Sequence, residues 1–461
     1  MTNREFSGAV TLSQAKGPRT RGRTRGTLRS LRAALLVLPL LSCGLLDTSQ
    51  PNIVDPGTLD SPEGAQTRRI GALTDFAFAQ DGDGTQFEDG HILLSGLMSD
   101  EFVLSTTPPT EQEIDQRRVF ETNSTLAGLF LNLHRARVAA EGAAAALEEF
   151  SPDPTVEPGI AEMHSLAGYT YLYFGESFCS GVPFSRLDGD TLVFGQPTST
   201  EETFALARAR FEEAVAHPGL AEDDGSVTGL ASVGLGRTLL DLGLFTEAAA
   251  AVAGVPTDFQ YVTEHAESPL RLQNPIWSYS VGFLWSVSDE EGGTGLPYRS
   301  AEDPRVPYQD EEDVGLDGST DQFTLLKYPD ATASVVVADG IEARLIEAEA
   351  VIQPSNPPLA LFTSILNDLR ETQGLDPLDQ PANRDEAVDL LFSERAFWLF
   401  ATGHRLGDMR RLIRQYGRSA DEVFPSGEYL KGGSYGEDVN LPIPVEEQNN
   451  PNSNGCIDRE A

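Results

Sequence analysis

The residues best spaced for catalysis in this chain are Asp81, Asp83 and Thr85, which form a D-x-D-x-T string. At the end of a buried strand, such a string can supply a nucleophilic carboxylate and a general acid for phosphoryl transfer. The preceding residues 71–79 have helical rather than strand spacing, however, and the later glycine and lysine elements of such a site cannot be placed. A calcium loop is also excluded, because Ile92 stands where a bidentate glutamate is needed. We therefore interpret this string as a solvated turn.

Other patterns that carry catalysis or bind metals do not occur. The six histidines form no H-E-x-x-H pattern, the three cysteines form no C-x-x-C pair, and the sequence contains neither a G-x-S-x-G elbow nor a phosphate loop. We therefore expect no catalytic residues, no metal site and no cofactor. With 71 acidic residues, counting alone leaves open a carboxylate pair of the kind that hydrolyses glycosides.

The charge balance restricts the partners. The chain has 461 residues, of which 40% are hydrophobic, so it is long and apolar enough to build a substantial core. Its 33 basic and 71 acidic residues give a formal charge of −38. This charge argues against nucleic acid or an anionic membrane surface as a partner.

The N-terminus has the composition of an export signal. Eight basic residues precede an apolar run at residues 33–41, which is too short to span a bilayer but suits a signal peptide. The L-S-C-G sequence that follows resembles a bacterial lipobox, in which Cys43 becomes the lipidated first residue. We expect residues 1–42 to be a lipoprotein signal peptide and residues 43–64 to be a lipid-anchored tether.

The most apolar helical stretch lies near the C-terminus, at residues 390–400, and its pattern predicts a helix that is buried on more than one side. Gly403 interrupts the pattern, and helical spacing then resumes. Arg405, Asp408 and Arg411 lie in this second segment. We interpret these three residues as an ion-pair network that ties the two helices together, not as catalytic groups.

These segments resemble the signature of the SusD/RagB family, bacterial outer-membrane lipoproteins that bind nutrients. The resemblance is carried by S-E-R at 393–395, G-H-R at 403–405 and G-D-M-R-R at 407–411. Two positions depart from the family pattern: Thr402 replaces a glutamate and Leu406 replaces an aromatic residue. Further landmarks similar to those of the family follow one another in the expected order, at residues 169–184, 303–305, 327–329, 341–351, 441–444 and 449–452.

Periodicity supports the helical architecture that this resemblance implies. Helical spacing occurs at residues 65–78, 111–150, 160–174, 201–216, 341–351 and 362–374. Residues 228–255 resemble a tetratricopeptide helix pair, in which the small residues Gly236 and Ala248 let two helices approach closely. Several such pairs would pack as an α-solenoid.

The segment from about 258 to 339 differs in composition and predicts an irregular insert of loops and short strands. Aromatic and apolar residues alternate with others from Trp277 to Trp285, which is the spacing of a strand. We therefore expect a mostly α fold for residues 65–461: a tetratricopeptide-like solenoid of helical pairs with this insert, similar to SusD.

The resemblance also implies a function. Proteins of this family capture oligosaccharides or similar nutrients at the outer surface of the outer membrane and deliver them to a TonB-dependent transporter. We therefore expect a lipid-anchored binding protein that faces the exterior and is not an enzyme. The alternative is a secreted, lipid-anchored glycoside hydrolase.

A glycan site needs exposed aromatic rings beside polar side chains, because sugars stack their C–H faces on rings. In or beside the insert, Trp285, Tyr298, Arg299 and Tyr308 meet this description. Trp277 and Trp285 would lie on the same face of the expected strand, and one face of a strand is usually buried. Burial in the core is therefore the competing interpretation for both residues. The sequence leaves open which glycan is bound, and whether a calcium ion occupies one of the acidic loops.

Finally, we expect a disulfide between Cys179 and Cys456. Once Cys43 is lipidated, these two cysteines remain in a chain that is exported through an oxidising compartment. Both lie in loop-like sequence, and a bridge would fix the C-terminal tail to the helical body.

Overall fold

The computed structural model describes residues 58–85, 89–189 and 191–461. The predicted signal peptide, the lipidated Cys43 and most of the tether lie outside this described part. Within it, none of the helices combines the length and hydropathy needed to cross a membrane.

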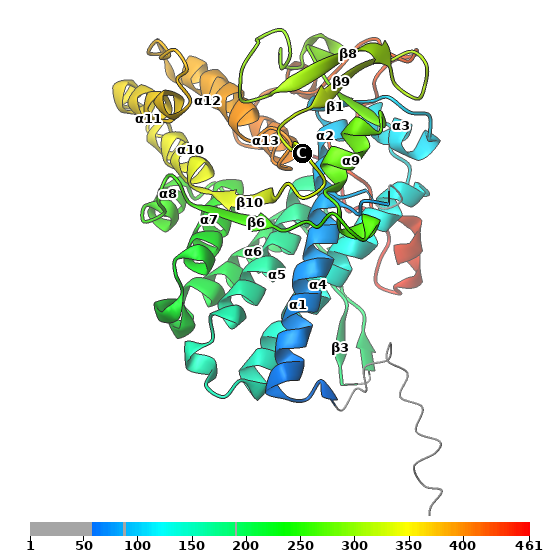
Figure 1. Cartoon of the computed structure of the whole chain (residues 1–461). Coiled ribbons are helices and arrows are strands. Elements are labelled where there is room, and N and C mark those ends of the chain that lie inside the picture. The colour runs from blue at the N-terminus through cyan, green and yellow to red at the C-terminus, as the bar shows by residue number, and fades with distance from the viewer. Residues whose placement is uncertain (1–57, 86–88, 190) are drawn as a thin grey trace, which may run out of the picture. The chain divides into compact units, whose positions relative to one another are not determined.

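Helices dominate the fold (Figure 1). The longer ones are α1 (Pro62–Asp81), α4 (Ser124–Phe150), α5 (Pro158–Ser177), α6 (Thr200–Val215), α7 (Ser226–Asp241), α8 (Phe245–Val252), α10 (Gly340–Val351), α11 (Leu359–Thr372), α12 (Arg384–Trp398) and α13 (Arg405–Arg414). The shorter ones are α2 (His91–Met98), α3 (Pro109–Asp115), α9 (Pro275–Val281) and α14 (Ala420–Val423), with 3₁₀ turns at Pro154–Val156, Pro218–Glu222, Leu270–Leu272, Glu291–Gly293 and Val445–Asn449.

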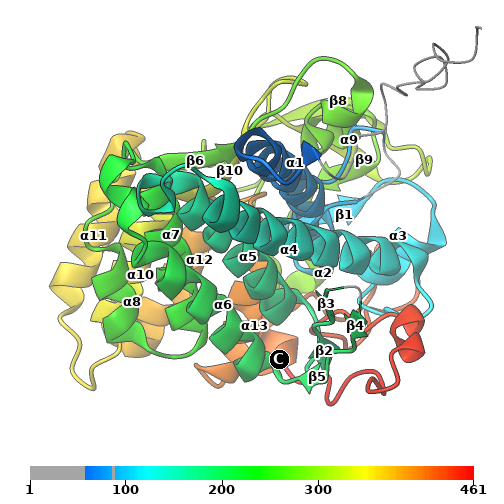
Figure 2. The ribbon, with the colours of Figure 1, turned by 90° about the horizontal axis from the view of Figure 1, so that it is seen from below.

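Neighbouring helices pack in succession, as Figure 2 shows from below. Helix α1 packs on α4, α4 on α5, α5 on α6, α6 on α7 and α7 on α8; α8 then contacts α10, which packs on α11. This arrangement confirms the predicted fold class, a tetratricopeptide-like series of helix pairs.

The predicted repeat unit at residues 228–255 forms α7 and α8. A Cβ atom added to Gly236 would lie 2.5 Å from Val252 Cγ1, so only glycine permits this approach of the two helices. Ala248 is fully buried at the same contact, and Gly243 has a φ of +71° in the turn between the helices. The small residues therefore have the role that the sequence predicted.

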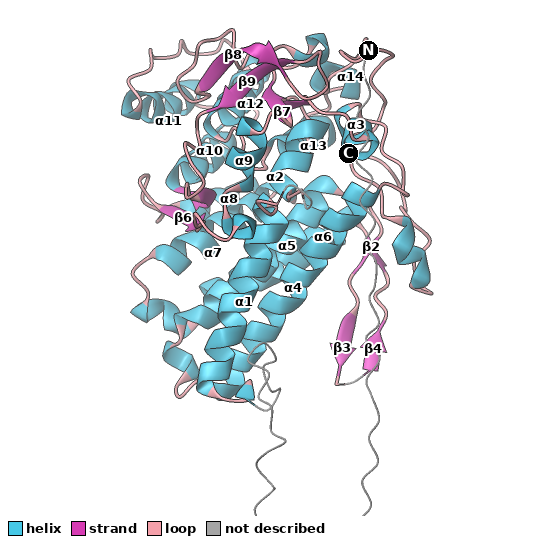
Figure 3. Ribbon diagram, turned by 45° about the vertical axis from the view of Figure 1, so that its right-hand side comes forward, coloured by secondary structure: helices cyan, strands magenta, loops and turns pink. Residues whose placement is uncertain are grey.

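The strands pair only two at a time within the described residues (Figure 3). The antiparallel pairs are β1 (Phe102–Leu104) with β7 (Trp285–Val287), β6 (Gln260–Thr263) with β10 (Val335–Asp339), β2 (Val182–Pro183) with β5 (Pro197–Thr198), β3 (Arg186–Asp188) with β4 (Thr191–Val193), and β8 (Tyr308–Val314) with β9 (Asp321–Leu325). Strands β6 to β10 lie in the predicted insert and its boundary with α10.

The strand expected from Trp277 to Trp285 is wrong over most of its length. Residues Pro275–Val281 form helix α9, and only Trp285 belongs to a strand. The side chain of Asn274 accepts a hydrogen bond from the backbone N–H of Trp277 at 2.9 Å, and Pro275 occupies the first turn. This capping chemistry starts a helix despite the alternating aromatic residues.

The interpretation of residues 81–85 as a solvated turn is also wrong. Asp81 is 1% exposed and Asp83 is 4% exposed, because β6 and the chain that follows it cover the end of α1. Asp81 Oδ2 accepts a hydrogen bond from Thr263 Oγ1 at 2.6 Å and lies 3.3 Å from His265 Nε2. Asp83 Oδ1 accepts from the backbone N–H of Thr85 at 3.0 Å.

The predicted ion-pair network is confirmed for Asp408 and Arg411 and is wrong for Arg405, whose partner is Asp100, between α2 and β1. Asp408 on α13 accepts hydrogen bonds from Arg395 on α12 at 2.7 Å and from Arg411 at 2.8 Å, while Arg405 binds Asp100 at 2.6 Å. All these side chains are buried. These buried ion pairs thus hold helices together inside the core.

Candidate functional site

The structure does not bring the four residues predicted to bind a ligand into one site. Trp285 is 1% exposed and Tyr298 is fully buried against Phe400, so neither ring presents a face to solvent. Arg299 and Tyr308 are half-buried beside β9: the Arg299 guanidinium lies 3.6 Å from the ring centre of Phe323, and the Tyr308 hydroxyl donates to the Arg299 carbonyl at 3.3 Å. These four side chains do not form one exposed aromatic platform.

Trp285 nevertheless lines a cavity of about 210 Å³ at the junction of the N-terminal helices and the insert. We call this the Trp285 cavity. Its apolar wall consists of Leu93, Leu97, Leu104, Tyr279, Leu284 and Trp285, and its polar groups are Thr85, Asp89, Thr106 and Glu111. Leu316, which is 65% exposed, and Pro108 complete the lining.

Strand pairing brings the two halves of this cavity together. In the β1–β7 ladder Leu104 lies opposite Trp285, and the backbone N–H of Ser105 donates to the Leu284 carbonyl at 3.0 Å. The loop that carries Leu316 packs on the same backbone. A Cβ atom added to Gly315 would lie 2.4 Å from the Ser105 carbonyl oxygen, so this close approach needs glycine.

A second close backbone approach positions Asp89. Residues Gly82 and Asp89 form an isolated β-bridge, and a Cβ atom added to Gly90 would lie 2.2 Å from the Gly82 backbone nitrogen. Gly90 also caps helix α2, which contributes Leu93 and Leu97 to the wall. The bridge to Gly82 and the close approach of Gly90 therefore fix the backbone at Asp89.

The carboxyl of Asp89 has an unusual environment. The pKa of Asp89 is raised to about 7, first by burial and then by the neighbouring carboxylates of Glu111 and Asp83. Asp83 already has partners, in Thr85 and in Arg271 Nε at 3.5 Å. Among the described residues, no group donates a hydrogen bond to the Asp89 side chain, which leaves it as an open acceptor beside the apolar wall.

Trp285 also has an unused polar atom. Its indole Nε1 is buried and has no hydrogen-bond partner among the described residues, although nearly all buried donors in proteins are paired. An aromatic side chain with an unpaired donor, an open carboxyl and two threonine hydroxyls thus surround one small space. Such a set of groups can bind a ligand that has both apolar faces and hydroxyls.

Sequence reasoning found only Trp285 among these residues. Asp89 and Glu111 were missed because each is one of many acidic residues, and they come from different elements. For metal ions, the part of the chain that the structure describes contains no group of three or more histidine, cysteine or acidic side chains arranged to bind one.

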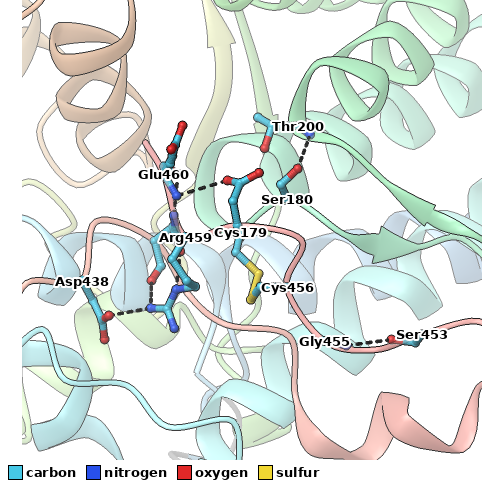
Figure 4. The surroundings of a disulfide bond; sticks show 11 residues. Cys179, Ser180, Thr200, Asp438, Ser453, Gly455, Cys456, Arg459 and Glu460 are labelled. Carbon is cyan, nitrogen blue, oxygen red and sulfur yellow. Dashed lines mark hydrogen bonds and ion pairs between the residues drawn. A yellow bond between two sulfur atoms is a disulfide. The ribbon is translucent and has the colours of Figure 1, made fainter.

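The disulfide lies at a different place, where the C-terminal tail crosses the end of α5 (Figure 4). Cys179 and Cys456 are bonded, with their Cα atoms 5.8 Å apart. Ser180 and Asp458 form a β-bridge beside them, and the Cys179 backbone N–H donates to the Leu441 carbonyl at 2.8 Å. Cys179 is only 2% exposed, so its surroundings are more buried than the loop-like sequence indicated.

The likeness of this chain to known proteins lies in its fold. No protein-family model matches the chain, and no curated protein matches its sequence. Solved structures do match. A SusD superfamily protein from Parabacteroides distasonis ATCC 8503 has a TM-score of 0.66 at 16% identity, over 86% of this chain and 98% of the other. One from Bacteroides vulgatus ATCC 8482 has a TM-score of 0.64 at 15% identity, over 87% and 99%.

A third similar structure contains a glycan. Surface glycan-binding protein A from Bacteroides thetaiotaomicron, in complex with laminarihexaose, has a TM-score of 0.63 at 13% identity, over 84% of this chain and 97% of that protein. These likenesses extend over nearly the whole length of each similar protein. The chain therefore has the SusD-like fold.

Proposed function

We propose that this SusD-like chain is a glycan-binding protein of the bacterial cell surface. The observation that carries the proposal is the combination of this fold with the Trp285 cavity, which offers an aromatic wall and hydroxyl-binding groups at the edge of the insert. Several proteins with the same fold are named as glycan-binding proteins, among them a laminarin-binding SusD-like protein. In this proposal Asp89 and Glu111 accept hydrogen bonds from sugar hydroxyls, and Leu316 contacts the sugar at the mouth of the cavity.

The proposal includes attachment and a partner. Cys43 would carry the lipid that holds the protein on the outer face of the outer membrane, and the bound glycan would pass to a TonB-dependent transporter. Both parts follow from the sequence resemblance. If Cys43→Ala protein remained in the membrane fraction after carbonate washing, lipid attachment at this residue would be disproved. Failure to co-purify with a TonB-dependent barrel encoded beside its gene would argue against this partner.

A binding assay tests the central claim. The mature chain is applied to an array of oligosaccharides, and the affinity for each hit is then measured by calorimetry. Leu316→Ala and Thr106→Ala should each weaken the binding of a hit several-fold, because both residues line the cavity. Tyr308→Ala is the comparison. Tyr308 is a predicted ligand residue outside the cavity lining, so this variant should bind the hit with wild-type affinity. Wild-type affinity in both cavity variants would place the glycan elsewhere.

The hydrolase alternative has one observation in its favour. A carboxyl with a raised pKa beside a second carboxylate is the arrangement that glycosidases use, and Asp89 and Glu111 have this relationship. The two functions differ in the fate of the ligand. Prolonged incubation of a bound oligosaccharide with the protein, followed by chromatography, should return the oligosaccharide intact if the protein only binds it.

A further inference from the structure

The Trp285 cavity has an excess of negative charge. Asp89 and Glu111 line it, and Asp83 lies close enough to raise the pKa of Asp89. The nearby basic groups already have acidic partners: Arg271 lies 3.5 Å from Asp83, and Lys431 lies 2.8 Å from Asp317 while donating to the Thr106 carbonyl. Among the residues that the structure describes, no cation compensates these two carboxyl groups of the cavity lining.

Two further observations indicate that this excess charge belongs to a ligand site. The carboxylates stand in a formed cavity whose wall is apolar. That wall includes the side chain of Trp285, which is 1% exposed and has an indole N–H without a partner. A ligand that fills the cavity has apolar contacts and two carboxyl acceptors available to it.

We infer that the Trp285 cavity selects uncharged, hydroxyl-rich sugars and rejects acidic ones, such as uronic acid or sulfated sugars. This inference rests on the glycan-binding function proposed above. Sugar hydroxyls can donate to Asp89 and Glu111, whereas a ligand carboxylate or sulfate has no proton to donate there. The like charges also repel across a partly water-excluded space, where salt screens them less than at the open surface.

A matched ligand pair tests this selection. The probe is the neutral oligosaccharide that binds best on an array, and its partner is the same oligosaccharide after oxidation of its primary hydroxyls to carboxylates. Calorimetry at low salt and pH 8.5, above the pKa of Asp89 so that both carboxyl groups are ionised, should give at least tenfold weaker binding for the oxidised form. Raising sodium chloride from 20 to 500 mM should reduce this difference in affinity between the neutral and oxidised forms. This part of the test uses the wild-type protein alone.

A double variant assigns the effect to the two lining carboxylates. Asp89→Asn/Glu111→Gln keeps the side-chain shapes and removes both charges. The difference in affinity between the oxidised and neutral forms should therefore be much smaller in this variant than in the wild-type protein. The control is Glu371→Gln/Asp376→Asn, which removes two exposed charges on and after α11, away from α3 in Figures 1 and 2. The control should retain the tenfold discrimination.

The outcomes separate the inference from the proposed function. Equal binding of both sugar forms, or full discrimination in the Asp89/Glu111 double variant, would overturn the inference while glycan binding stands. If no neutral oligosaccharide bound the wild-type chain, the proposed function would fail and the inference with it.

Discussion

Asp408 Oδ2 lies 2.7 Å from Arg395 Nε, and this ion pair joins α13 to α12 inside the core. Burial alone would raise the pKa of Asp408, but the Arg395 and Arg411 guanidinium groups outweigh burial and hold this pKa well below its usual range. The contribution of Asp408 to stability is therefore fully present above about pH 4, where the unfolded carboxyl is also ionised, and it is lost as pH falls through the lower pKa of the folded state.

Asp408→Ala should lower the free energy of unfolding by about 3 to 5 kcal/mol, because it leaves two buried arginines short of a partner. Urea titration at pH 7 measures this change. Asp389→Ala is the control: Asp389 pairs with Arg418 at 2.6 Å, but its side chain is 65% exposed, so the loss should stay below about 1 kcal/mol. Similar losses in the two variants would show that the buried network has no special role.

The contact at Gly236 gives a second prediction. Gly236→Ala places a Cβ atom 2.5 Å from Val252 Cγ1, and the strain should lower the free energy of unfolding by about 1 to 3 kcal/mol. Thermal unfolding followed by circular dichroism measures the effect. Gly142→Ala, on α4, meets nothing within 4 Å and should stabilise the protein by up to about 1 kcal/mol, since alanine favours helix. A stabilised Gly236→Ala variant would contradict the close packing of α7 on α8.

This helix pair shows how far sequence reasoning reached. Gly236 and Ala248 predicted a close helix pair, and the signature at 393–411 predicted the buried pair of Asp408 and Arg411, because both patterns depend on residues near one another in sequence. The partner of Arg405, Asp100, is 305 positions away and was not predicted. The secondary structure of the insert was harder to predict from the sequence. From Trp277 to Trp285 the alternating aromatic residues predicted a strand, yet the Asn274–Pro275 cap, which is also visible in the sequence, starts a helix.

The candidate site could be predicted only in small part. Asp89 and Glu111 are 22 positions apart. They come together because α2 packs on α3 and both contact β1, and the pairing of β1 with β7, between residues 102–104 and 285–287, adds Trp285 to the same cavity. No periodicity in either segment indicates that pairing. Trp285 was recognised as an aromatic candidate, but its burial depends on the same long-range contact.

The disulfide between Cys179 and Cys456 gives a third prediction. Cys179→Ser/Cys456→Ser should lower the free energy of unfolding by about 2 to 4 kcal/mol, because the bridge closes a long loop and restricts the unfolded chain. Hydrogen exchange should also speed up in residues 445–461, while α12 and α13 remain protected. Adding reductant to the wild-type protein should reproduce the effect and leave the double variant unchanged. Unchanged exchange in the tail would mean that its hydrogen bonds alone hold it.

The raised pKa of Asp89 gives the last prediction, which concerns stability without any ligand. The unfolded carboxyl has a pKa near 3.8, whereas in the folded protein its pKa is about 7. Between these values the folded protein binds more protons than the unfolded chain, so this residue makes the free energy of unfolding fall as pH rises, until about pH 7. The charged groups that act on it are Glu111 on α3 and Asp83 after α1, the latter beside Arg271.

Asp89→Asn removes this titration while keeping the side-chain shape. Relative to wild type, the variant should gain about 1 to 3 kcal/mol of unfolding free energy at pH 8 and little or nothing at pH 4.5, where the wild-type carboxyl is protonated in the folded state. Urea titrations at the two pH values measure the difference, and Glu371→Gln, an exposed carboxylate on α11, should show no such pH-dependent gain. An equal effect of Asp89→Asn at both pH values would mean that Asp89 ionises normally in the folded protein and that Glu111 and Asp83 do not act on it.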